Sequence, residues 1–309
     1  MRLLVTGASG FIGKNLLLKA PKNWDVVATY YKSEDFPDFV KENSLKNVQA
    51  IRVNLESARE TKEKLDGFRF DCVVHLAANT DTMLSVKNPE KDFRSNVLAL
   101  LNAVKATKIK DLIFLSSGTV YDEYSGFVSP RKKVNPSLPY AVSKLACENY
   151  VSYFKRYGLI EDYVILRFFG AYGPFESPRK IFTKLVKAFY FDSSNEFQVV
   201  GDGNNFIDAM YIDDAVRGIL AVVKSDVRDV TVDFACGTPL TINQLVTRVA
   251  EIFGRKNVKM KHVGEPVEYI RFYVSSSDMK RLYRFEPLTS LEEGIWKLAK
   301  WLEKKKEPA

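Results

Sequence analysis

The first thirteen residues constrain the fold more than any other part of this chain. They read MRLLVTGASGFIG, a short apolar run followed by Gly7, Gly10 and Gly13 at a spacing of three. The apolar run is too short for a helix and predicts a buried strand. Glycines between a strand and a helix let the backbone turn tightly and approach a pyrophosphate, whose charge then rests on the helix N-terminus. Three glycines also occur in ordinary turns, but their position and flanking elements favour a dinucleotide-binding site.

Predicted strands and helices alternate through the first half of the chain. Five further apolar runs predict strands at 26–30, 48–53, 72–76, 112–115 and 163–166. Stretches with helical periodicity lie between them, at 14–19, 58–64, 92–107 and 140–157. Several strands are apolar without alternation, which is typical of a parallel sheet covered on both faces. We therefore predict an α/β fold with a doubly wound parallel (Rossmann) sheet.

The composition changes after the last of these strands. Loops rich in Gly, Pro and Asn separate shorter elements, among them amphipathic helices at 241–253 and 290–303. We expect residues 1–169 to form a dinucleotide-binding domain. Residues 170–309 are expected to form a smaller substrate-binding lobe, partly interleaved with it. This lobe is predicted to lie at the carboxyl edge of the sheet, where open α/β sheets bind ligands.

Charge and cysteine usage exclude several classes of function. The net charge is +8, but the lysine clusters at 131–133 and 304–306 have no interleaved aromatic residues, so we expect no nucleic-acid partner. No run of 18 apolar residues predicts a membrane span. The chain enters its first strand at once, which leaves no room for a signal peptide and predicts a cytoplasmic protein. Three scattered cysteines and two histidines predict neither disulfides nor a metal site.

A second group of residues lies at the start of the predicted helix 140–157. Tyr140 and Lys144 follow Pro139 and stand four residues apart, so they share one helical face. A tyrosine hydroxyl has an ordinary pKa of about 10, too high for a proton shuttle at neutral pH. A nearby ammonium and the positive nicotinamide of an oxidised cofactor favour the phenolate and lower that pKa. Combined with the glycine turn, this pair predicts hydride transfer at a carbon that bears a hydroxyl.

Small hydroxyl residues follow the predicted strand 112–115. Ser116, Ser117 and Thr119 stand at its carboxyl end, where side chains of a parallel strand point into the ligand crevice. Ser117 is therefore a candidate hydrogen-bond partner for a substrate hydroxyl or ketone. The alternative is a strand-ending turn of small polar residues, but the presence of Tyr140 favours the functional interpretation.

A series of family motifs runs along nearly the whole chain. It comprises Gly7–Gly13, His75–Ala78, Asn96-Val97, Ser116-Ser117 with Val120-Tyr121, Pro139-Tyr140 with Ser143-Lys144, Tyr172–Pro174, Gly201–Gly203, Tyr211–Asp214 and Phe285–Gly294. On these motifs the chain resembles the extended short-chain dehydrogenase/reductases, specifically the NAD(P)-dependent nucleotide-sugar epimerases, dehydratases and reductases.

The resemblance implies roles for individual residues. Tyr140 is the implied acid/base, Lys144 its pKa partner and a ligand of the cofactor ribose, and Ser117 the partner of the substrate hydroxyl. The expected cofactor contacts are Gly7, Gly10, Phe11, Ile12, Gly13, Tyr30, Lys32, Asn54, Leu55, Leu76, Ala77, Ala78, Lys144 and Phe168. The expected substrate contacts are Thr80, Thr119, Gly170, Arg179 and Arg271. A homodimer paired through the helices near 92–107 and 140–157 is also implied.

Departures from the family pattern narrow the function. Dehydratases of the family place a Glu just past the serine, where this chain has Gly118 and Thr119, so dehydration is disfavoured. NAD-preferring members commonly end the second strand with an Asp. Here Tyr30 stands at that position and Lys32 is available to face a 2′-phosphate, which tilts the choice between NAD and NADP toward NADP. The adenine-side Asp after the third strand is replaced by Asn54-Leu55.

The substrate side departs as well. The Asn usual before the Tyr-Gly-Pro motif is Gly170, and the Arg that often contacts the nucleotide diphosphate is Ile207. Arg179 and Arg271 are candidate replacements, although each is equally expected as a plain surface residue. Recognition of the nucleotide sugar is therefore less firmly predicted than the catalytic residues.

Three functions follow from these observations. The leading hypothesis is an NAD(P)-dependent epimerase that acts on a nucleotide-activated sugar through a keto intermediate. The alternative is an NADPH-dependent nucleotide-sugar 4-ketoreductase, which would use the same residues once. A non-catalytic cofactor-binding regulatory subunit is least favoured, because such proteins typically lose the Tyr or the Lys and this chain retains Tyr140 and Lys144.

Overall fold

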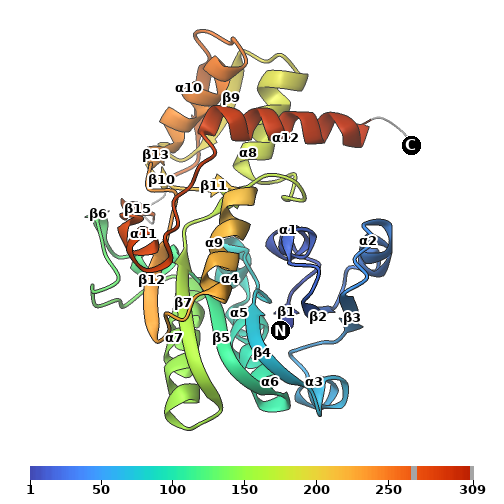
Figure 1. Ribbon diagram of the computed structural model, residues 1–309. Coiled ribbons are helices and arrows are strands. Elements are labelled where there is room, and N and C mark those ends of the chain that lie inside the picture. The colour runs from blue at the N-terminus through green and yellow to red at the C-terminus, as the bar shows by residue number, and fades with distance from the viewer. Residues whose placement is uncertain (266–269, 307–309) are drawn as a thin grey trace.

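A computed structural model describes residues 1–265 and 270–306 (Figure 1). The strands are β1 (Arg2–Thr6), β2 (Asp25–Tyr30), β3 (Val48–Arg52), β4 (Arg69–His75), β5 (Lys108–Ser117), β6 (Ser125–Phe127), β7 (Ile160–Phe168), β8 (Ala171–Tyr172), β9 (Glu196–Val200), β10 (Phe206–Ile207), β11 (Met210–Tyr211), β12 (Val230–Phe234), β13 (Leu240–Thr241), β14 (Lys259–Val263) and β15 (Arg271–Tyr273). The helices are α1 (Phe11–Lys19), α2 (Phe36–Glu42), α3 (Ala58–Leu65), α4 (Thr82–Lys87), α5 (Pro89–Phe93), η1 (Arg94–Leu98), α6 (Ala99–Ala106), η2 (Gly118–Tyr121), α7 (Pro139–Arg156), α8 (Ile181–Val186), η3 (Lys187–Phe191), α9 (Ile212–Lys224), α10 (Ile242–Ile252), α11 (Ser277–Tyr283) and α12 (Leu291–Lys306).

A seven-stranded parallel sheet forms the centre of the molecule, in the order β12-β7-β5-β4-β1-β2-β3. Successive side chains of a strand point to opposite faces, and β1 accordingly contributes to two separate cores. Leu3 and Val5 pack in the cluster that contains residues of α1 and α9, whereas Leu4 packs in the cluster that contains residues of α6 and α7. The predicted doubly wound sheet, with helices on both faces, is therefore confirmed.

Most predicted strands and helices are present, with shifted ends. The six predicted strands correspond to β1, β2, β3, β4, β5 and β7, and the helices near 58–64 and 140–157 correspond to α3 and α7. The predicted helix 14–19 begins earlier, at Phe11. The predicted helix 92–107 is instead divided into α5, the π-helical turn η1 and α6, and ends at Ala106. The seventh strand, β12, was not predicted.

The segment after β7 lies largely above the carboxyl end of the sheet (Figure 1). It returns to the sheet once, where β12 pairs with β7. The helices α8, α10 and α12 lie together at the top of the view, and α12 extends across toward α1 and α2 (Figure 1). Ring contacts join this part to the sheet domain, because the Phe175 ring lies 5.5 Å from Phe39 of α2 and 5.4 Å from Trp301 of α12.

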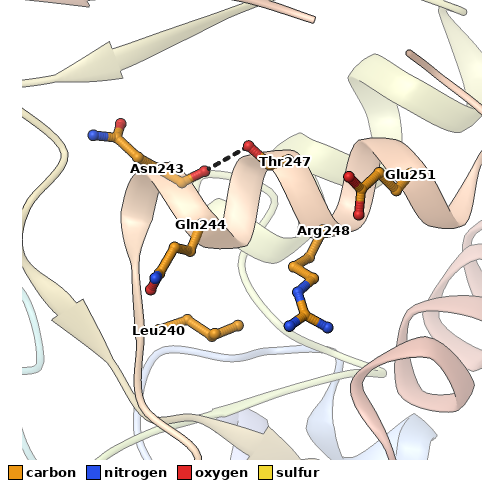
Figure 2. A pocket seen from close by; sticks show the side chains of 6 residues that line it. All are labelled: Leu240, Asn243, Gln244, Thr247, Arg248 and Glu251. Atoms are coloured by element: carbon orange, nitrogen blue, oxygen red, sulfur yellow. Dashed lines mark hydrogen bonds between the residues drawn. The ribbon is translucent and has the colours of Figure 1, made fainter. Parts of the chain in front are cut away.

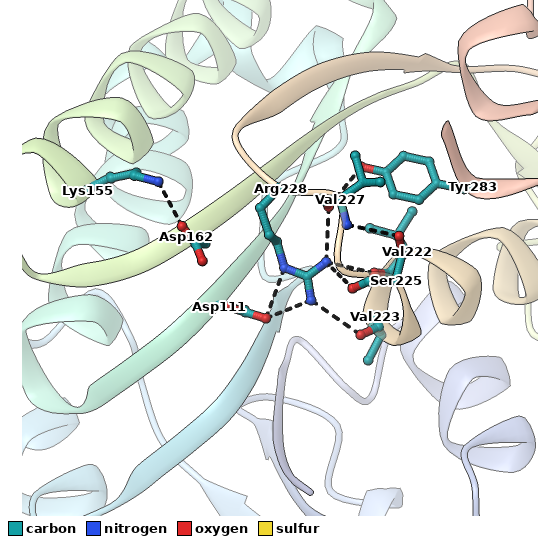
Figure 3. A network of polar contacts seen from close by, with 9 residues as sticks. All are labelled: Asp111, Lys155, Asp162, Val222, Val223, Ser225, Val227, Arg228 and Tyr283. Carbon is teal, nitrogen blue, oxygen red and sulfur yellow. Dashed lines mark hydrogen bonds and ion pairs between the residues drawn. The ribbon is translucent and has the colours of Figure 1, made fainter. Parts of the chain in front are cut away.

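Arg228 anchors the end of α9 to the sheet (Figure 3). Its Nε and Nη2 donate to Asp111 Oδ2 of β5 at 2.9 and 2.6 Å, and its guanidinium also donates to the carbonyl oxygens of Val222 and Val223. These carbonyls belong to the last turn of α9, where carbonyl groups lack partners within the helix. The contact fixes the helix end just before β12 enters the sheet.

Within residues 1–265 and 270–306, no helix combines the length and the apolar composition needed to cross a bilayer.

Candidate active site

The glycine turn between β1 and α1 has a backbone that only glycine fits. Gly7 has a φ of +63°, and a Cβ there would lie 2.8 Å from the Ala77 N and Cα atoms. A Cβ on Gly13 would lie 2.6 Å from Ala8 O. Gly10 is the N-cap of α1 and provides no side-chain cap. The first amides of α1 therefore face the turn without a side-chain competitor, the arrangement in which a helix N-terminus binds an anion.

The end of β4 lies directly beside this turn. Thr6 Oγ1 accepts hydrogen bonds from Leu76 N at 3.1 Å and from Ala77 N at 3.2 Å, and it also pairs with His75 Nδ1 at 3.0 Å. Burial and the charge of Lys144 lower the pKa of His75 to about 3, so its ring is neutral. The half-buried segment from Leu76 to Ala78 is thereby fixed next to the glycines.

Ser117 and Tyr140 meet at the carboxyl end of β5. Ser117 is the last residue of β5, and its Oγ accepts hydrogen bonds from Thr119 N at 3.2 Å and Thr119 Oγ1 at 2.9 Å. Tyr140, in the first turn of α7, lies close enough to Ser117 for the serine side chain to act on the pKa of its hydroxyl. Ser117, Tyr140 and Lys144 are 8%, 7% and 4% exposed. The three residues that the sequence predicts as catalytic are thus buried on adjoining elements.

Lys144 lies one turn further along α7. Its Nζ donates to Leu115 O at 2.8 Å and lies 4.8 Å from the centroid of the Phe114 ring, while burial lowers its pKa. Burial also raises the pKa of Tyr140 to about 12, and the Ser117 side chain opposes that rise only in part. The lowered pKa expected from the sequence also depends on the positive charge of an oxidised nicotinamide, which adds to the effect of the protein's own groups.

A cluster of buried polar residues lies behind Tyr140. The sequence did not predict this cluster as part of the site. Asn96 Nδ2 donates to Asp92 Oδ1 at 3.0 Å and to Ser143 Oγ at 2.8 Å, and Asn96 Oδ1 accepts from Asn79 N at 2.7 Å. Ser143 Oγ in turn donates to Tyr140 O at 2.9 Å. The cluster connects η1, the loop after β4 and the first turn of α7. The signals in the sequence were the Asn96-Val97 motif and Ser143 in the motif that contains Lys144, and neither Asn96 nor Ser143 had an assigned role.

Strands β2 and β3 end on the side where the ribose of a dinucleotide is expected. Tyr30 is the last residue of β2 and is half-buried, and Lys32 is exposed. Burial acts to raise the pKa of Glu56, but hydrogen bonds from Lys91 and Ser95 and the charges of Lys91 and Lys32 lower it overall. The charge of Lys32 therefore acts on a carboxylate of the protein itself.

Asn54 and Leu55 follow β3 directly. Asn54 N donates to Glu60 Oε1 at 2.9 Å, and the buried Leu55 accepts a hydrogen bond at its carbonyl from Asn102 Nδ2 at 2.8 Å. These contacts fix the loop after β3 against α3 and α6. Phe168, the last residue of β7, is in register with Ser117 and packs its ring 5.3 Å from Phe234.

Three predicted substrate residues follow strands of the central sheet. Thr80 is exposed in the loop after β4, Thr119 is bonded to Ser117, and Gly170 follows β7. Gly170 has a φ of +126°, and a Cβ there would lie 3.4 Å from Ala209 Cβ. All three therefore belong to the carboxyl edge of the sheet.

The two candidate arginines lie on other elements. Arg179 is exposed in the turn before α8. Arg271 lies on β15, and its Nη2 is 3.0 Å from Asp202 Oδ2, an ion pair within the second part of the chain. The Ile207 side chain, at the position where the family pattern has Arg, is half-buried on β10. The described contacts bring neither arginine to Ser117 or Tyr140.

Two surface recesses lie apart from these residues. One has a volume of about 320 Å³ and is lined, on and before α10, by Leu240, Asn243, Gln244, Thr247, Arg248 and Glu251 (Figure 2). The other, of about 710 Å³, is lined by Pro174, Tyr211, Ser290, Glu292, Glu293, Trp296, Lys297, Lys300, Trp301 and Lys304. No predicted site residue lines either recess. In the described ranges no group of His, Cys, Asp or Glu has the arrangement of a metal site.

Comparison with known proteins identifies relatives across the whole chain. The model of the NAD dependent epimerase/dehydratase family matches residues 3–237. A protein of Bacillus subtilis described as an uncharacterized UDP-glucose epimerase, YtcB, is 33% identical, and the alignment covers 96% of each chain. The UDP-glucuronate 4-epimerase of Thermodesulfobacterium geofontis is 27% identical and is covered over 95% of its length, with 96% of this chain aligned.

A solved structure shares the fold. The UDP-glucuronic acid 4-epimerase of Bacillus cereus, in complex with UDP-glucuronic acid and NAD, superposes with a TM-score of 0.84 at 25% identity. The superposition covers 99% of this chain and 100% of the Bacillus cereus chain.

Proposed function

The chain belongs to the NAD dependent epimerase/dehydratase family, and we propose that it is a UDP-sugar epimerase that inverts C4 of the sugar through a transient keto intermediate. It is an enzyme, and its cofactor is NAD or NADP. The observation that carries the proposal is the position of Ser117 beside Tyr140, with Lys144 one turn away, at the sheet edge that also holds the glycine turn. The names of all three relatives support the choice of UDP, and the names of the two 4-epimerases support the choice of C4.

The glycine turn fits a dinucleotide. The close approach of Gly7 to Ala77 and the uncapped start of α1 leave backbone amides for a pyrophosphate. We propose that this turn holds the cofactor together with the segment Leu76–Ala78, Phe168, Asn54 and Leu55. Tyr30 and Lys32 would lie at the ribose that carries the 2′-phosphate in NADP. The bound nicotinamide supplies a reversible hydride acceptor.

The residues of the pair divide the proton chemistry. Tyr140 Oη takes the proton of the sugar hydroxyl as the carbon below it loses hydride, and Ser117 Oγ donates a hydrogen bond to the same oxygen. The Lys144 ammonium contributes positive charge and a ribose contact. After the keto sugar has turned, Tyr140 returns the proton to the oxygen. Because the proton and the hydride are both returned, the reaction inverts one carbon without net oxidation.

The substrate contacts follow the same edge. We propose that Thr80, Thr119 and Gly170 line the sugar side, and that Arg179 and Arg271 serve the diphosphate, for which Arg271 must leave or share Asp202. We also propose the division into a cofactor domain, residues 1–169, and a partly interleaved substrate lobe, residues 170–309. The exposed Lys32 supports a preference for NADP over NAD. The charge of Lys32 acts on Glu56, however, and this opposes the preference because Glu56 competes for that charge.

We further propose the homodimer that the sequence implies, paired through α7 and the helices near 92–107, and we extend this face to α4 and α5. Apolar side chains are exposed on these helices: Leu84 at 38%, Val86 at 53%, Phe93 at 46%, Val142 at 47% and Tyr153 at 42%. These three helices lie next to one another, since α4 and α5 both pack on α7. Their exposed apolar side chains can therefore belong to one surface. Exposed apolar surface of this extent is typical of a protein–protein interface.

The test is to incubate the purified protein with UDP-glucose, UDP-glucuronate and UDP-N-acetylglucosamine without added cofactor, and to analyse the sugars by chromatography. The expected result is interconversion with the C4 epimer. Tyr140→Phe should lower the rate by about 10²–10⁴, whereas Tyr150→Phe, half-exposed on the same helix, should not. Turnover only after addition of NADPH would establish the reductase instead. Unchanged turnover in Tyr140→Phe would remove the proposed mechanism.

A further inference from the structure

A chain of buried polar residues links the strands beneath the candidate site. Ser116 of β5, Arg167 of β7 and Asp233 of β12 are in register on three adjacent strands. Tyr121 of η2 and Glu148 of α7 complete the set, which we call the Arg167 network. Every member is 6% exposed or less, and Asp233 is 1% exposed.

Hydrogen bonds connect all five members. Arg167 Nε donates to both Glu148 oxygens at 3.1 and 3.2 Å, and Nη2 donates to Oε2 at 2.7 Å. Ser116 Oγ donates to Glu148 Oε1 at 2.6 Å. On its other side, Arg167 Nη1 donates to Tyr121 Oη at 2.8 Å, and Tyr121 Oη donates to Asp233 Oδ1 at 2.9 Å. Arg167 is therefore shared between Glu148 and the Tyr121–Asp233 pair.

The charges of the network do not balance when all groups are ionised. Two carboxylates, Glu148 and Asp233, face one guanidinium, and Asp233 Oδ2 is buried without a hydrogen-bond partner among the described residues. Burial raises the pKa of Asp233 to about 7. Tyr121 and Arg167 oppose the rise, and the charges of Asp278 on α11 and Glu148 on α7 add to it. A proton on the unpartnered oxygen makes the network neutral.

The network touches both halves of the candidate site. Ser116 immediately precedes Ser117, and Tyr121 ends the turn η2 that Ser117 caps. Glu148 lies one turn beyond Lys144 on α7. A change in how Arg167 is shared therefore acts on the segment that presents Ser117 to Tyr140.

We propose that Asp233 is a positioning residue: in its neutral form it leaves Arg167 on Glu148 and keeps the segment 116–121 ordered, and its ionisation draws Arg167 toward Tyr121 and loosens that segment. The predicted effect on turnover rests on the proposed function, whereas the predicted ordering of the segment 116–121 does not. If only the neutral form is fully active, kcat falls by about tenfold between pH 6 and pH 8, with KM unchanged.

The first measurement needs no substrate. Hydrogen–deuterium exchange of peptides covering 116–122 is followed by mass spectrometry at pH 6 and pH 8, corrected for intrinsic rates. The native protein is expected to lose about tenfold protection at pH 8, and Asp233→Asn is expected to be equally protected at both. Asp111→Asn is the matched control, because Asp111 is also a buried carboxylate, paired with Arg228, with one oxygen that has no partner in the described part of the chain. It should retain the pH response of the native protein.

The second measurement is the pH profile of kcat on a UDP-sugar that turns over. Asp233→Asn should keep its kcat between pH 6 and pH 8, while the native protein and Asp111→Asn decline. If Asp233→Asn does not fold, Tyr121→Phe, which removes only the bridging hydroxyl, should abolish the pH response of the segment. Equal exchange of the native protein and the variant at pH 8 overturns the proposal. Absence of turnover on every UDP-sugar, with the exchange result as expected, rejects the proposed function alone.

Discussion

At the scale of single residues, Gly7 and Gly13 allow close contacts between backbone segments around the turn before α1. The missing Cβ of Gly7 faces backbone atoms of Ala77, which cannot rotate away as a side chain would. The missing Cβ of Gly13 faces the Ala8 carbonyl. Glycine at these positions therefore serves both the turn and the packing of the end of β1 on that of β4.

Gly7→Ala is expected to destabilise the fold by several kcal/mol and to abolish cofactor retention. The left-handed φ alone costs about 1–2 kcal/mol for alanine, and the contact with Ala77 adds to it. Thermal unfolding and the cofactor content after gel filtration measure the two effects. Gly158→Ala is the matched control, since Gly158 also has a positive φ, +71°, but apart from its chain neighbours no atom of the described residues lies within 4 Å of the added carbon. A similar loss in both variants would contradict the role of close packing.

Glu176 is expected to make stability depend on pH. Burial raises its pKa to about 7, although Thr183 Oγ1 donates to its Oε2 at 2.9 Å. Because the folded pKa is raised, the folded chain holds a proton that the unfolded chain releases. The stabilisation is therefore complete below about pH 4.5 and is lost as pH rises to about 7.

Glu176→Gln should consequently match the native protein near pH 4.5 and exceed its free energy of unfolding at pH 8 by up to about 3 kcal/mol. Urea unfolding at the two pH values measures the difference. Glu42→Gln, at an exposed position at the end of α2, is the control and should follow the native curve. A Gln variant of Glu176 that is no more stable at pH 8 than at pH 4.5, relative to native, would refute the assignment.

Sequence reasoning finds residues whose partners are near in the chain. Tyr140 and Lys144 are four apart on one helix, and Gly7, Gly10 and Gly13 share one turn, so local patterns reveal them. The Arg167 network has no such pattern, because Arg167 and Asp233 become neighbours only through the pairing of β7 with β12. The raised pKa of Tyr140 was likewise not predicted, since burial is a property of the folded chain.

At the scale of elements, the predicted helix 92–107 illustrates a limit of periodicity. The sequence repeats its apolar residues at helical spacing, but the chain inserts the π-helical turn η1 between α5 and α6. A π-helical turn adds a residue and rotates the helix beyond it, and such turns often mark functional sites. Here it carries the buried Asn96 toward Ser143. β12 was missed for a related reason, because Asp233 interrupts its apolar run.

Tyr153→Arg is expected to convert the proposed dimer into a monomer. Tyr153 is exposed on α7 and its ring centroid lies 4.6 Å from that of Tyr157, so a charge there disrupts an apolar surface without entering the core. Light scattering during gel filtration measures the mass. Leu288→Arg, at a position 77% exposed outside these helices, should leave the mass unchanged. A native protein that is already monomeric would exclude this interface.

At the scale of the whole molecule, the doubly wound sheet was predictable because several of its strands are continuous apolar runs. The arrangement of the second part was not, since its strands are only two to five residues long and carry weak patterns. Ring contacts such as Phe39 with Phe175 and Phe175 with Trp301 join segments far apart in sequence. No local pattern identifies such pairs.

A fragment of residues 1–169 is expected not to fold as a cooperative unit. It lacks β12, so β7 becomes an unpaired edge and Phe168 loses the Phe234 ring. A fragment of residues 1–237 retains both and should show more cooperative unfolding by circular dichroism. Equal cooperativity of the two fragments would show that the cofactor domain does not depend on β12.

The strand order has a consequence for how the sheet is assembled during synthesis. β2 pairs with β1 and β3 with β2, after which β4 pairs with the other side of β1. Then β5, β7 and β12 each pair with the strand just before them in the sheet, in chain order. Each new strand emerging from the ribosome thus meets a free edge, and no strand has to be inserted between two that are already paired. A nascent chain of this protein can grow its sheet by addition at the edges alone.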